Sequence, residues 1–573
     1  MLEIKQFPQD MSALELDRSD LRKCLTQGLY EEAVNLNVKN RRFLTWLCPG
    51  LHSARPSLIL VPDSRVPVEE QLENGFWLRF AQEREISLHV LVPEDGGWDP
   101  EGGDADYMNK VFLEIMSRKH YVLIPDNAYA LGLGDGAAVA QQAVMKMSSE
   151  YSGLATFGDL PEAVKSGFEA SFGAVETGKT ELTVNAAKAP VPVWMGWSAN
   201  TGANAAVAEY WKRQNAVDPE PFSNGLADEI YFPAKLAKTS QLNEEQCAEV
   251  RITNGFSGTP DQKLLAAVWD FLNSACRHRG FGGKFLRRRI GPREYGMEQH
   301  SLVHKGFTRI WYEYVPAAVR SSGEAAPLVV NMHGRGGSAD TFVDLSAMSR
   351  VAEERGFIVI FPEAAVYQQR PGGLRNILLW NGSYKGEDLD DVGFVLKAIA
   401  DVRSRYAIDP TRIYACGQSS GGMMTSALAQ KAPEIFAAAS PWSAIVDPEH
   451  ELVLPERIDP AVPYLFLFGE KDWLVVNREK GRLPYHADPD IASFLENLMK
   501  IYRLDPNPHC YTCGEITYYV YPNAQGVPML TVGTVRDMSH ANYPRESWIA
   551  YDEFMAKFTK KNGTLYYMGT PVV

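Results

Sequence analysis

This 573-residue sequence lacks several features of membrane, secreted and nucleic-acid-binding proteins. No stretch approaches 18 consecutive apolar residues, the length that a membrane-spanning helix needs. The first residues are polar and mixed in charge, without the apolar segment and cleavage site of a secretory signal. The formal net charge of −14 offers no basic field to nucleic acid. We therefore expect a cytoplasmic protein that binds neither membranes nor nucleic acid.

Cysteine is also sparse, with seven residues and no regular spacing. Small domains held by disulfides carry a dense and even set of cysteines, so we expect mostly reduced thiols here. Cys510 and Cys513 form a single CxxC pair. A structural zinc site needs four ligands and no second pair exists, so we expect no metal. The two cysteines are either plain thiols or a local disulfide.

The pattern of apolar residues indicates an α/β protein with more than one domain. Its 45% hydrophobic and 22% charged residues are typical of globular proteins, and 573 residues exceed what one core supports. Ser57–Val61 and Leu88–Val92 are short apolar runs typical of buried strands, whereas 78–85 and 107–117 have helical periodicity. This alternation predicts a mostly parallel sheet with helices on both faces.

The order of these segments recurs in the second half of the chain. SLILVPD (57–63) is matched by PLVVNMH (327–333), and YALGLGDGAA (129–138) is matched by YACGQSSGGM (414–423). Each match is short, but the order and approximate spacing of the matches agree. The sequence therefore predicts two tandem copies of one α/β domain.

Between the two copies lies a run rich in glycine and arginine, residues 277–294. Such a run could form an anion or nucleic-acid patch, but in an acidic protein we favour a linker pinned against acidic domain surfaces. The predicted segments are an N-terminal extension (1–35), a first copy (36–276), the linker (277–299) and a second copy (300–573).

The second copy contains the motif Gly-Gln-Ser-Ser-Gly at 417–421. It lies between a short apolar run that ends at Cys416 and a helical pattern that begins at Gly422. This strand–turn–helix context is typical of a nucleophile elbow, in which the central serine is exposed on a strained turn. The sequence therefore predicts Ser419 as a nucleophile.

A serine hydroxyl needs a base and an acid that orients the base, and both follow the serine in this arrangement. Asp472 comes directly after the apolar run 463–468, at the expected end of a strand. His540 follows another strand pattern and precedes a helical segment, whereas His486 and His509 do not. We predict Asp472 and His540 as the acid and the base.

An oxyanion hole is predicted from the glycine-rich loop Asn331–Gly337, which follows an apolar strand pattern. Backbone N–H groups of such a loop can stabilise a developing oxyanion, and the residue after the nucleophile usually supplies a second donor. We predict the N–H groups of Arg335 and Ser420 as these donors. We expect His333 near the substrate, as a residue that braces the loop rather than as a second base.

Residues from about 300 to 560 resemble the polyhydroxybutyrate depolymerases, feruloyl esterases and acetylxylan esterases of the α/β-hydrolase superfamily. The matching pieces are His333-Gly334, Trp380-Asn381, Asp390–Phe394, Asp409–Ile413, Gly417–Gly422, Gly469–Asp472 and His540. The resemblance implies two tandem α/β-hydrolase-like domains and, in the second, a carboxylic-ester hydrolase that works through an acyl-enzyme. It implies no metal and no organic cofactor.

Two expectations concern the substrate. Arg335 stands where an uncharged residue is commoner in this family, so we hypothesise that its side chain binds an anionic group of the substrate. Trp380, Trp442 and Trp473 lie near predicted loop ends, where they either line an aromatic or sugar-facing pocket or pack in the core. The predicted substrate is a small-molecule or oligosaccharide ester, such as a feruloylated, acetylated or hydroxyalkanoate ester.

The first copy lacks all three triad residues at the matching positions. Ser419 aligns with Gly134, Asp472 with Ala199 and His540 with Gly258. The glycines around Gly134 do not form a dinucleotide loop, which would open the domain and read G-x-G-x-x-G. We therefore expect a catalytically inactive first copy. We favour a packing or dimer-interface role for it over a role as a wall of the substrate cleft.

Three other functions remain open at this stage. A peptidase of the prolyl-oligopeptidase type has the same fold and triad order, but its β-propeller would require a run of short strands that is absent here. A non-catalytic scaffold built from two hydrolase-like domains is disfavoured by the complete triad in the second copy. A thioesterase or transacylase has the same sequence signature as an esterase. A homodimer is possible.

Overall fold

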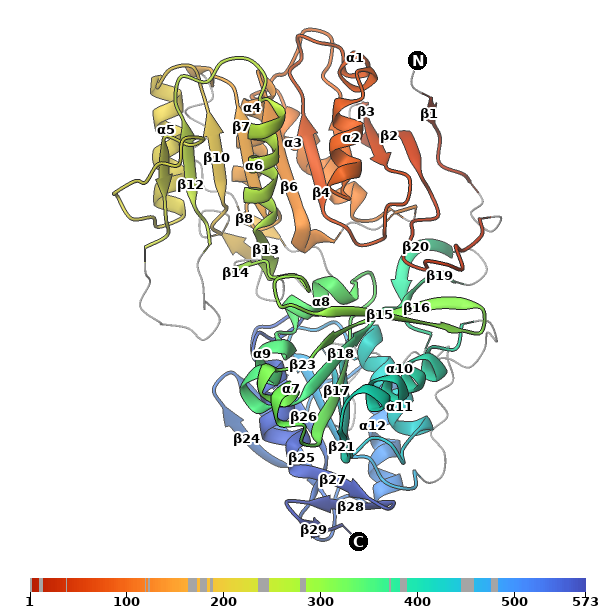
Figure 1. Ribbon diagram of the computed structural model, residues 1–573. Coiled ribbons are helices and arrows are strands. Elements are labelled where there is room, and N and C mark those ends of the chain that lie inside the picture. The colour runs from red at the N-terminus through yellow and green to blue at the C-terminus, as the bar shows by residue number, and fades with distance from the viewer. Residues whose placement is uncertain are drawn as a thin grey trace.

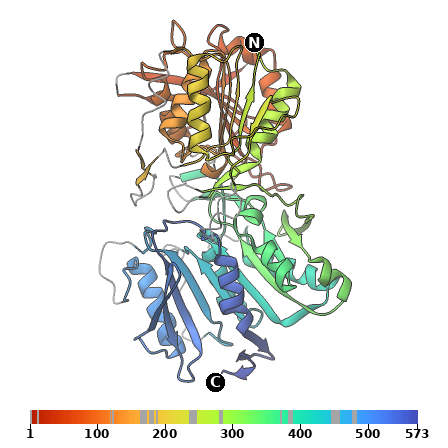
Figure 2. The same cartoon turned by 90° about the vertical axis from the view of Figure 1, so that its left-hand side faces the viewer.

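The computed structural model describes residues 3–9, 14–37, 39–118, 120–121, 124–162, 173–175, 183–185, 189–234, 247–278, 285–369, 373–381, 389–444, 458–475 and 483–572. The chain forms two α/β lobes, which lie one above the other in Figure 1 and in the perpendicular view of Figure 2. Each lobe is built on its own ten-stranded mixed sheet. This is the α/β class that the sequence predicts.

The first sheet lies in the N-terminal lobe. In spatial order its strands are β1 (Ile4–Lys5), β2 (Gly28–Asn35), β3 (Asn40–Leu47), β5 (Ser87–Leu91), β4 (Ser57–Val61), β6 (Ala128–Leu133), β7 (Gly153–Phe157), β10 (Val193–Gly196), β12 (Val250–Thr253) and β11 (Glu229–Tyr231). The helices are α1 (Val68–Glu73), α2 (Phe76–Glu83), α3 (Asp104–Ile115), α4 (Gly136–Lys146), α5 (Gly202–Gln214) and α6 (Gln262–Asn273). Helices α3, α4 and α5 share one buried apolar cluster, and α1, α2 and α6 share another.

The second sheet lies in the C-terminal lobe. Its strands, again in spatial order, are β15 (Glu298–His304), β16 (Phe307–Tyr314), β18 (Ile358–Pro362), β17 (Ala326–Met332), β21 (Ile408–Gln418), β22 (Ala438–Trp442), β23 (Tyr464–Gly469), β26 (Pro528–Val535), β25 (Ile516–Pro522) and β24 (His509–Cys513). The helices are α7 (Ala317–Ser322), α8 (Ala339–Leu345), α9 (Met348–Arg355), α10 (Asp391–Arg405), α11 (Ser420–Lys431), α12 (Pro489–Tyr502) and α13 (Glu546–Trp548). Residues 549–554 continue α13 as a π-helical turn.

Smaller sheets complete the described fold. They are the pairs β8 (Gly173–Val175) with β9 (Thr183–Asn185), β13 (Ala275–His278) with β14 (Phe285–Arg288) and β19 (Ala365–Gln369) with β20 (Gly373–Leu379), and the group β27 (Phe558–Lys561), β28 (Thr564–Tyr567) and β29 (Thr570–Pro571). Among the helices of the described residues, none combines the length and apolarity that crossing a membrane requires.

The two large sheets share one strand order and one set of pairing directions. The nine strands from β2 to β11 in the first sheet correspond in order to the nine from β15 to β25 in the second. Within these nine strands the pairs at each end are antiparallel and the central pairs are parallel. Outside them, β1 pairs with β2 in parallel. Strands β4, β6, β17 and β22 are buried along their whole length, and β21 is buried from Ile413 to Gly417, as expected for parallel strands that helices cover on both faces.

The N-terminal boundary of the first lobe differs from the prediction. We expected residues 1–35 to be an extension, but Gly28–Asn35 forms β2 and pairs with β3 along its full length. The sequence signal that was missed is the hairpin turn, where Asn35 Oδ1 accepts the N–H of Asn37 (2.7 Å) and Asn37 has a positive φ of 68°.

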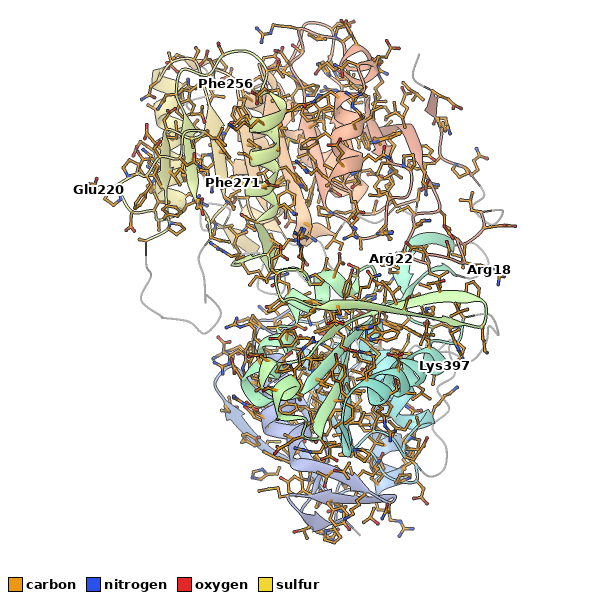
Figure 3. The ribbon with its side chains drawn as sticks, in the orientation of Figure 1. Arg18, Arg22, Glu220, Phe256, Phe271 and Lys397 are labelled. Carbon is orange, nitrogen blue, oxygen red and sulfur yellow. The ribbon has the colours of Figure 1, made fainter. Side chains whose placement is uncertain are left out.

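The segment before β2 contacts the second lobe. The N–H of Thr308 donates to the carbonyl oxygen of Arg18 (2.8 Å), and the N–H of Val366 donates to that of Leu21 (2.8 Å). The Arg18 guanidinium lies 4.6 Å from the centre of the Phe307 ring. Figure 3 shows Arg18 and Arg22 at the level where the two lobes meet. This segment therefore ties the N-terminus to the second lobe.

The predicted linker likewise begins inside the first lobe. Residues 275–278 and 285–288 form the β13–β14 hairpin at the end of α6. The buried Arg277 guanidinium donates to the carbonyl oxygens of Tyr151 (2.8 Å), Ser148 (2.5 Å) and Pro190 (2.6 Å). Because these bonds fix Arg277 in the first lobe, the connection to the second lobe starts only after β14.

Two ion pairs join the lobes at helix α8, which lies at the boundary in Figure 1. Arg55 of the first lobe binds Asp340, and Arg287 of β14 binds Asp344. Ala54 and Ile124 of the first lobe are buried in the same apolar cluster as α10 and α11 of the second. Helix α8 directly follows the loop that is predicted to form the oxyanion hole, so the first lobe holds the element next to that loop.

Candidate active site

The predicted nucleophile lies on a sharp turn between β21 and α11. Ser419 has φ 53° and ψ −116°, a conformation that costs a non-glycine residue about 1–3 kcal/mol. Its N–H donates to the carbonyl oxygen of Trp442 at the end of β22 (2.8 Å), which holds the turn in place. A Cβ atom at Gly421 would lie 2.1 Å from the carbonyl oxygen of Met332. Only glycine at 421 lets the helix approach β17 so closely.

The three predicted triad residues meet at one edge of the second sheet. Asp472 and His540 follow β23 and β26, two parallel neighbours whose carboxyl ends share an edge with that of β21. His540 Nε2 lies 3.0 Å from Ser419 Oγ. His540 Nδ1 lies 3.1 and 3.0 Å from the two carboxylate oxygens of Asp472, which is fully buried. With its Nδ1 proton donated to Asp472, His540 presents Nε2 as the acceptor for the serine hydroxyl.

A buried carboxyl group supports the loop that carries His540. Glu546 accepts hydrogen bonds from the side-chain amide of Asn542 and from the N–H of Tyr543 (3.0 Å). Burial raises the pKa of Glu546 to about 8, although these two hydrogen bonds act in the opposite direction. Glu546 is therefore largely protonated at neutral pH. The Trp473 ring also lies beside the His540 ring, with the ring centres 5.5 Å apart.

The predicted oxyanion loop is fixed by His333, which is buried. His333 Nδ1 lies 2.8 Å from the carbonyl oxygen of Gly334, and Nε2 lies 2.8 Å from Glu363 Oε1. His333 thus has the bracing position that we expected, and its side chain is almost fully buried. The side chain of Arg335 is exposed. Ser420 is the first residue of α11, where backbone N–H groups have no acceptor within the helix.

Two of the three tryptophans predicted to bind substrate are core residues. Trp380 is 1% exposed and donates from Nε1 to the carbonyl oxygen of His333 (2.8 Å). Trp442 is fully buried and donates from Nε1 to Ser440 Oγ (3.0 Å). Both indole N–H groups are satisfied inside the protein, so the pocket prediction is wrong for these two residues. Trp473 is partly exposed beside His540.

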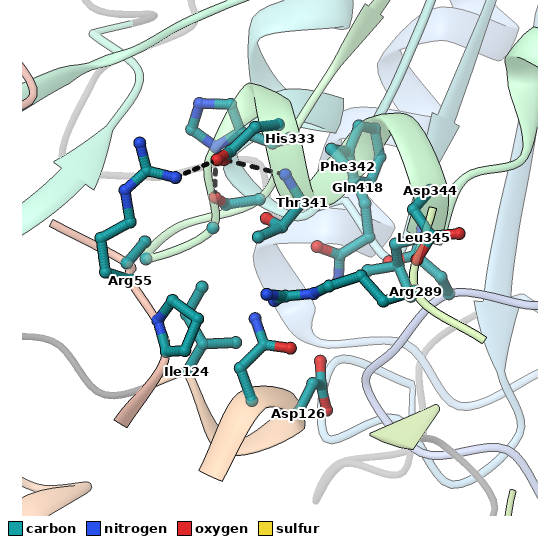
Figure 4. A pocket seen from close by; sticks show the side chains of 18 of the residues that line it. Arg55, Ile124, Asp126, Arg289, His333, Thr341, Phe342, Asp344, Leu345 and Gln418 are labelled. Carbon is teal, nitrogen blue, oxygen red and sulfur yellow. Dashed lines mark hydrogen bonds and ion pairs between the residues drawn. The ribbon is translucent and has the colours of Figure 1, made fainter. Parts of the chain in front are cut away.

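A cleft of about 410 Å³ adjoins the triad and is lined by both lobes. The second lobe contributes the oxyanion loop 333–337, Gln418 and residues 540–542. The opposite wall comes from Asp126, Asn127 and Arg287 of the first lobe and from residues 289–292 of the connecting segment. Figure 4 shows Asp126 and Ile124 on one side of this cleft and His333 and Phe342 on another. The first lobe thus forms a wall of the cleft, the role that we had favoured less.

No sequence pattern indicates this wall. Asp126 and Asn127 stand in an ordinary strand-entry turn before β6, and Arg289 belongs to the run that we interpreted as a linker. Their place at the site depends on how the lobes dock.

The corresponding edge of the first sheet has a similar turn but none of the triad residues. Gly134 has φ 55°, and its N–H donates to the carbonyl oxygen of Phe157 at the end of β7 (2.8 Å), as Ser419 does to Trp442. A Cβ atom at Gly134 would lie 2.3 Å from Asp63 Oδ2. A carboxylate therefore occupies the space that a nucleophile's side chain would need. A second cavity of about 630 Å³ lies here, lined among others by Asp63, Gly134 and Gly258.

Within the part of the chain that the structure describes, no group of three or more His, Cys, Asp or Glu side chains is arranged to hold a metal ion. All seven cysteines have free thiols, and those of Cys510 and Cys513 are exposed. The CxxC pair on β24 therefore takes the plain-thiol form of the two forms left open by the sequence.

Comparison with known proteins places the similarity in the second lobe. Residues 311–454 match the family model described as Esterase PHB depolymerase. The chain is 35% identical over 144 residues to feruloyl esterase B of Piromyces equi, covering 25% of each chain. It is 32% identical over 134 residues to feruloyl esterase B of Neurospora crassa, covering 23% of this chain and 43% of that enzyme. With poly(3-hydroxyalkanoate) depolymerase C of Paucimonas lemoignei it shares 24% identity over 247 residues, 40% of this chain and 57% of that enzyme.

These matches are partial, because the chain spans less than two thirds of the length of each of these relatives. The family match includes Arg335 and Ser419 but ends before Asp472 and His540. Among solved structures, an acetyl xylan esterase from Aspergillus awamori aligns with 45% of this chain and 99% of its own, at 16% identity and a TM-score of 0.33.

Proposed function

We propose that this protein is a serine carboxylic-ester hydrolase and that its active site is the triad of the second lobe. The observation that carries the proposal is the unbroken line of contacts from Ser419 Oγ through His540 to the buried carboxylate of Asp472, at 3.0 and 3.0–3.1 Å. The family match over residues 311–454 and the esterase relatives support the same reaction class.

The mechanism follows from these contacts. Ser419 Oγ attacks the ester carbonyl carbon while His540 Nε2 takes the hydroxyl proton, and Asp472 stabilises the imidazolium that forms. The N–H groups of Arg335 and Ser420 stabilise the tetrahedral oxyanion. Collapse of this intermediate breaks the ester bond, and the proton passes from His540 to the leaving alcohol. Water, activated by His540, then attacks the acyl-enzyme and releases the acid and free Ser419.

The direct test is hydrolysis of 4-nitrophenyl esters of increasing acyl length, and of methyl ferulate, by the wild type and by Ser419→Ala. We expect activity in the wild type and its loss in Ser419→Ala. Ser420→Ala is the matched control, because its contribution comes from the backbone N–H and the side chain has no assigned role. An active Ser419→Ala enzyme would contradict the assignment of the nucleophile.

We further propose that the first lobe is an inactive copy of the second that serves as a wall of the substrate cleft. Its shared strand order, the equivalent turn at Gly134 and the absence of triad residues at 134, 199 and 258 support this proposal. By analogy with the relatives, the substrates would be feruloyl, acetyl or hydroxyalkanoate esters. Cytoplasmic location and a homodimer stay predictions, which cell fractionation and light scattering would test.

A further inference from the structure

The cleft beside the triad is rich in arginine. Four arginines and three aspartates line it, in a chain whose net charge is −14. The arginines are Arg55, Arg287, Arg289 and Arg335, and the aspartates are Asp126, Asp340 and Asp344. The cleft therefore carries an excess of positive charge where the protein as a whole is acidic, which favours an anionic occupant.

Two of these arginines already have carboxylate partners. Arg55 is paired with Asp340, and Arg287 is paired with Asp344. These pairs join the lobes and leave little charge for a ligand. Arg289 differs, because its side chain donates from Nη1 to the neutral amide oxygen of Asn273 (2.6 Å). The described residues give Arg289 no ion pair, although its charge helps to lower the pKa of Asp340, less than that of Arg55 does.

The guanidinium of Arg289 is also well placed. Figure 4 shows its side chain reaching across the cleft, between Gln418 of the second lobe and Asp126 of the first. Gln418 directly precedes Ser419, and His540 lines the same cleft. Apolar side chains of Ile124, Phe342 and Leu345 surround the space and reduce competition from water.

From this arrangement we infer that Arg289 binds a carboxylate of the ester substrate. A guanidinium presents paired N–H donors that match the two oxygens of a carboxylate, and such charged bonds are about twice as strong as neutral ones. The inference rests on the proposed ester hydrolysis, and it gives the first lobe and its connecting segment a part in substrate choice.

The test compares esters that differ only in the carboxylate. On the acyl side the pair is 4-nitrophenyl valerate and mono-4-nitrophenyl glutarate. On the alcohol side it is methyl 4-acetoxybenzoate and 4-acetoxybenzoate. The informative pair is the one in which the wild type cleaves the anionic ester faster than the neutral ester. In that pair we expect Arg289→Gln to lower kcat/KM for the anionic ester roughly ten- to a hundredfold, the loss typical of a charged hydrogen bond. The value for the neutral ester should stay within about twofold, and Arg289→Lys should retain part of the preference.

The matched control is Arg293→Gln, because Arg293 is an exposed arginine four residues further along the same segment and outside the cleft. It should leave both esters unchanged. If Arg289→Gln lowers both esters equally or neither, the inference is wrong while ester hydrolysis stands.

If the wild type cleaves no ester, the proposed function fails, and binding tests Arg289 separately. Calorimetric titration of Ser419→Ala with monomethyl glutarate, which carries one carboxylate, should then give heat that Arg289→Gln in the same background abolishes. Equal binding by both proteins, or binding by neither, would overturn the inference.

Discussion

The contact between the lobes at Asp340 gives the sharpest test of the architecture. Burial alone would raise the pKa of Asp340, but it is outweighed by the Arg55 guanidinium, a hydrogen bond from Ser338, the charge of Arg289 and the N–H of Thr341, which together lower the pKa from 3.8 to about 2. A shift of this size corresponds to about 2 kcal/mol of stability, since one pKa unit is about 1.4 kcal/mol. Asp340→Asn removes this contribution without changing the shape of the side chain.

The size of the loss depends on what remains beside Arg55. Removing one partner of a buried ion pair costs about 3–5 kcal/mol when the other is left unpaired. Glu85 stays 3.1 Å from the Arg55 guanidinium, so Arg55 keeps one carboxylate. We therefore expect Asp340→Asn to lower the free energy of unfolding at pH 7 by about 2 kcal/mol, the value from the pKa shift.

The dependence on pH follows from the sign of the shift. Because the folded pKa lies below the unfolded one, the contribution is complete above pH 3.8 and disappears as the pH falls towards 2. Urea unfolding of the wild type and Asp340→Asn between pH 7 and pH 2.5 should give two curves that converge at low pH. Asp552→Asn, which breaks an exposed pair with Arg355, should leave the free energy of unfolding nearly unchanged at every pH. A constant difference between wild type and Asp340→Asn, or none at pH 7, would refute the reasoning.

Three further outcomes are expected. Gly421→Ala should abolish ester hydrolysis and reduce soluble yield, because the added Cβ would lie 2.1 Å from a carbonyl oxygen of β17. Normal activity of this variant would contradict the packing described for the turn at Ser419. The wild type should lose about 2 kcal/mol of stability between pH 6 and pH 8, because the folded pKa of Glu546 is raised to about 8 and its ionisation opposes folding over this range. In Glu546→Gln, the denaturation midpoint should change less between pH 6 and pH 8. Gly134→Ser in a Ser419→Ala background should restore no 4-nitrophenyl ester hydrolysis, because no base follows it and Asp63 fills the space, so any turnover would show a second site.

The triad could be predicted from sequence because each member is marked by a local pattern. Ser419, Asp472 and His540 each follow a short apolar strand, and parallel strands bring their carboxyl ends to one edge whatever the rest of the fold does. The tryptophans could not be assigned in the same way. Trp442 ends a strand that is buried to its last residue, and whether a strand's last side chain points into the core depends on the elements packed above it.

The composite cleft had no sequence signal for a related reason. Arg289 reaches the site through the docking of two lobes, and that docking rests on contacts such as Arg55 with Asp340, which join residues 285 positions apart. Neither residue stands in a motif. The hairpin that adds β2 was missed because its asparagine turn lies in a stretch that otherwise appears as an irregular extension.

The turn at Gly134 also indicates the origin of the strained backbone conformation at Ser419. Both residues have a positive φ, 55° and 53°, and both donate to the carbonyl at the end of the next strand. One of the two sites holds no triad, so the conformation does not depend on chemistry being done there. The positive φ is a property of the fold, because it occurs in both lobes where this central strand is followed by its helix. The position of the serine is thus set by the sheet. What distinguishes the second lobe is the Ser419 side chain on that turn, together with Asp472 and His540 on the loops after β23 and β26.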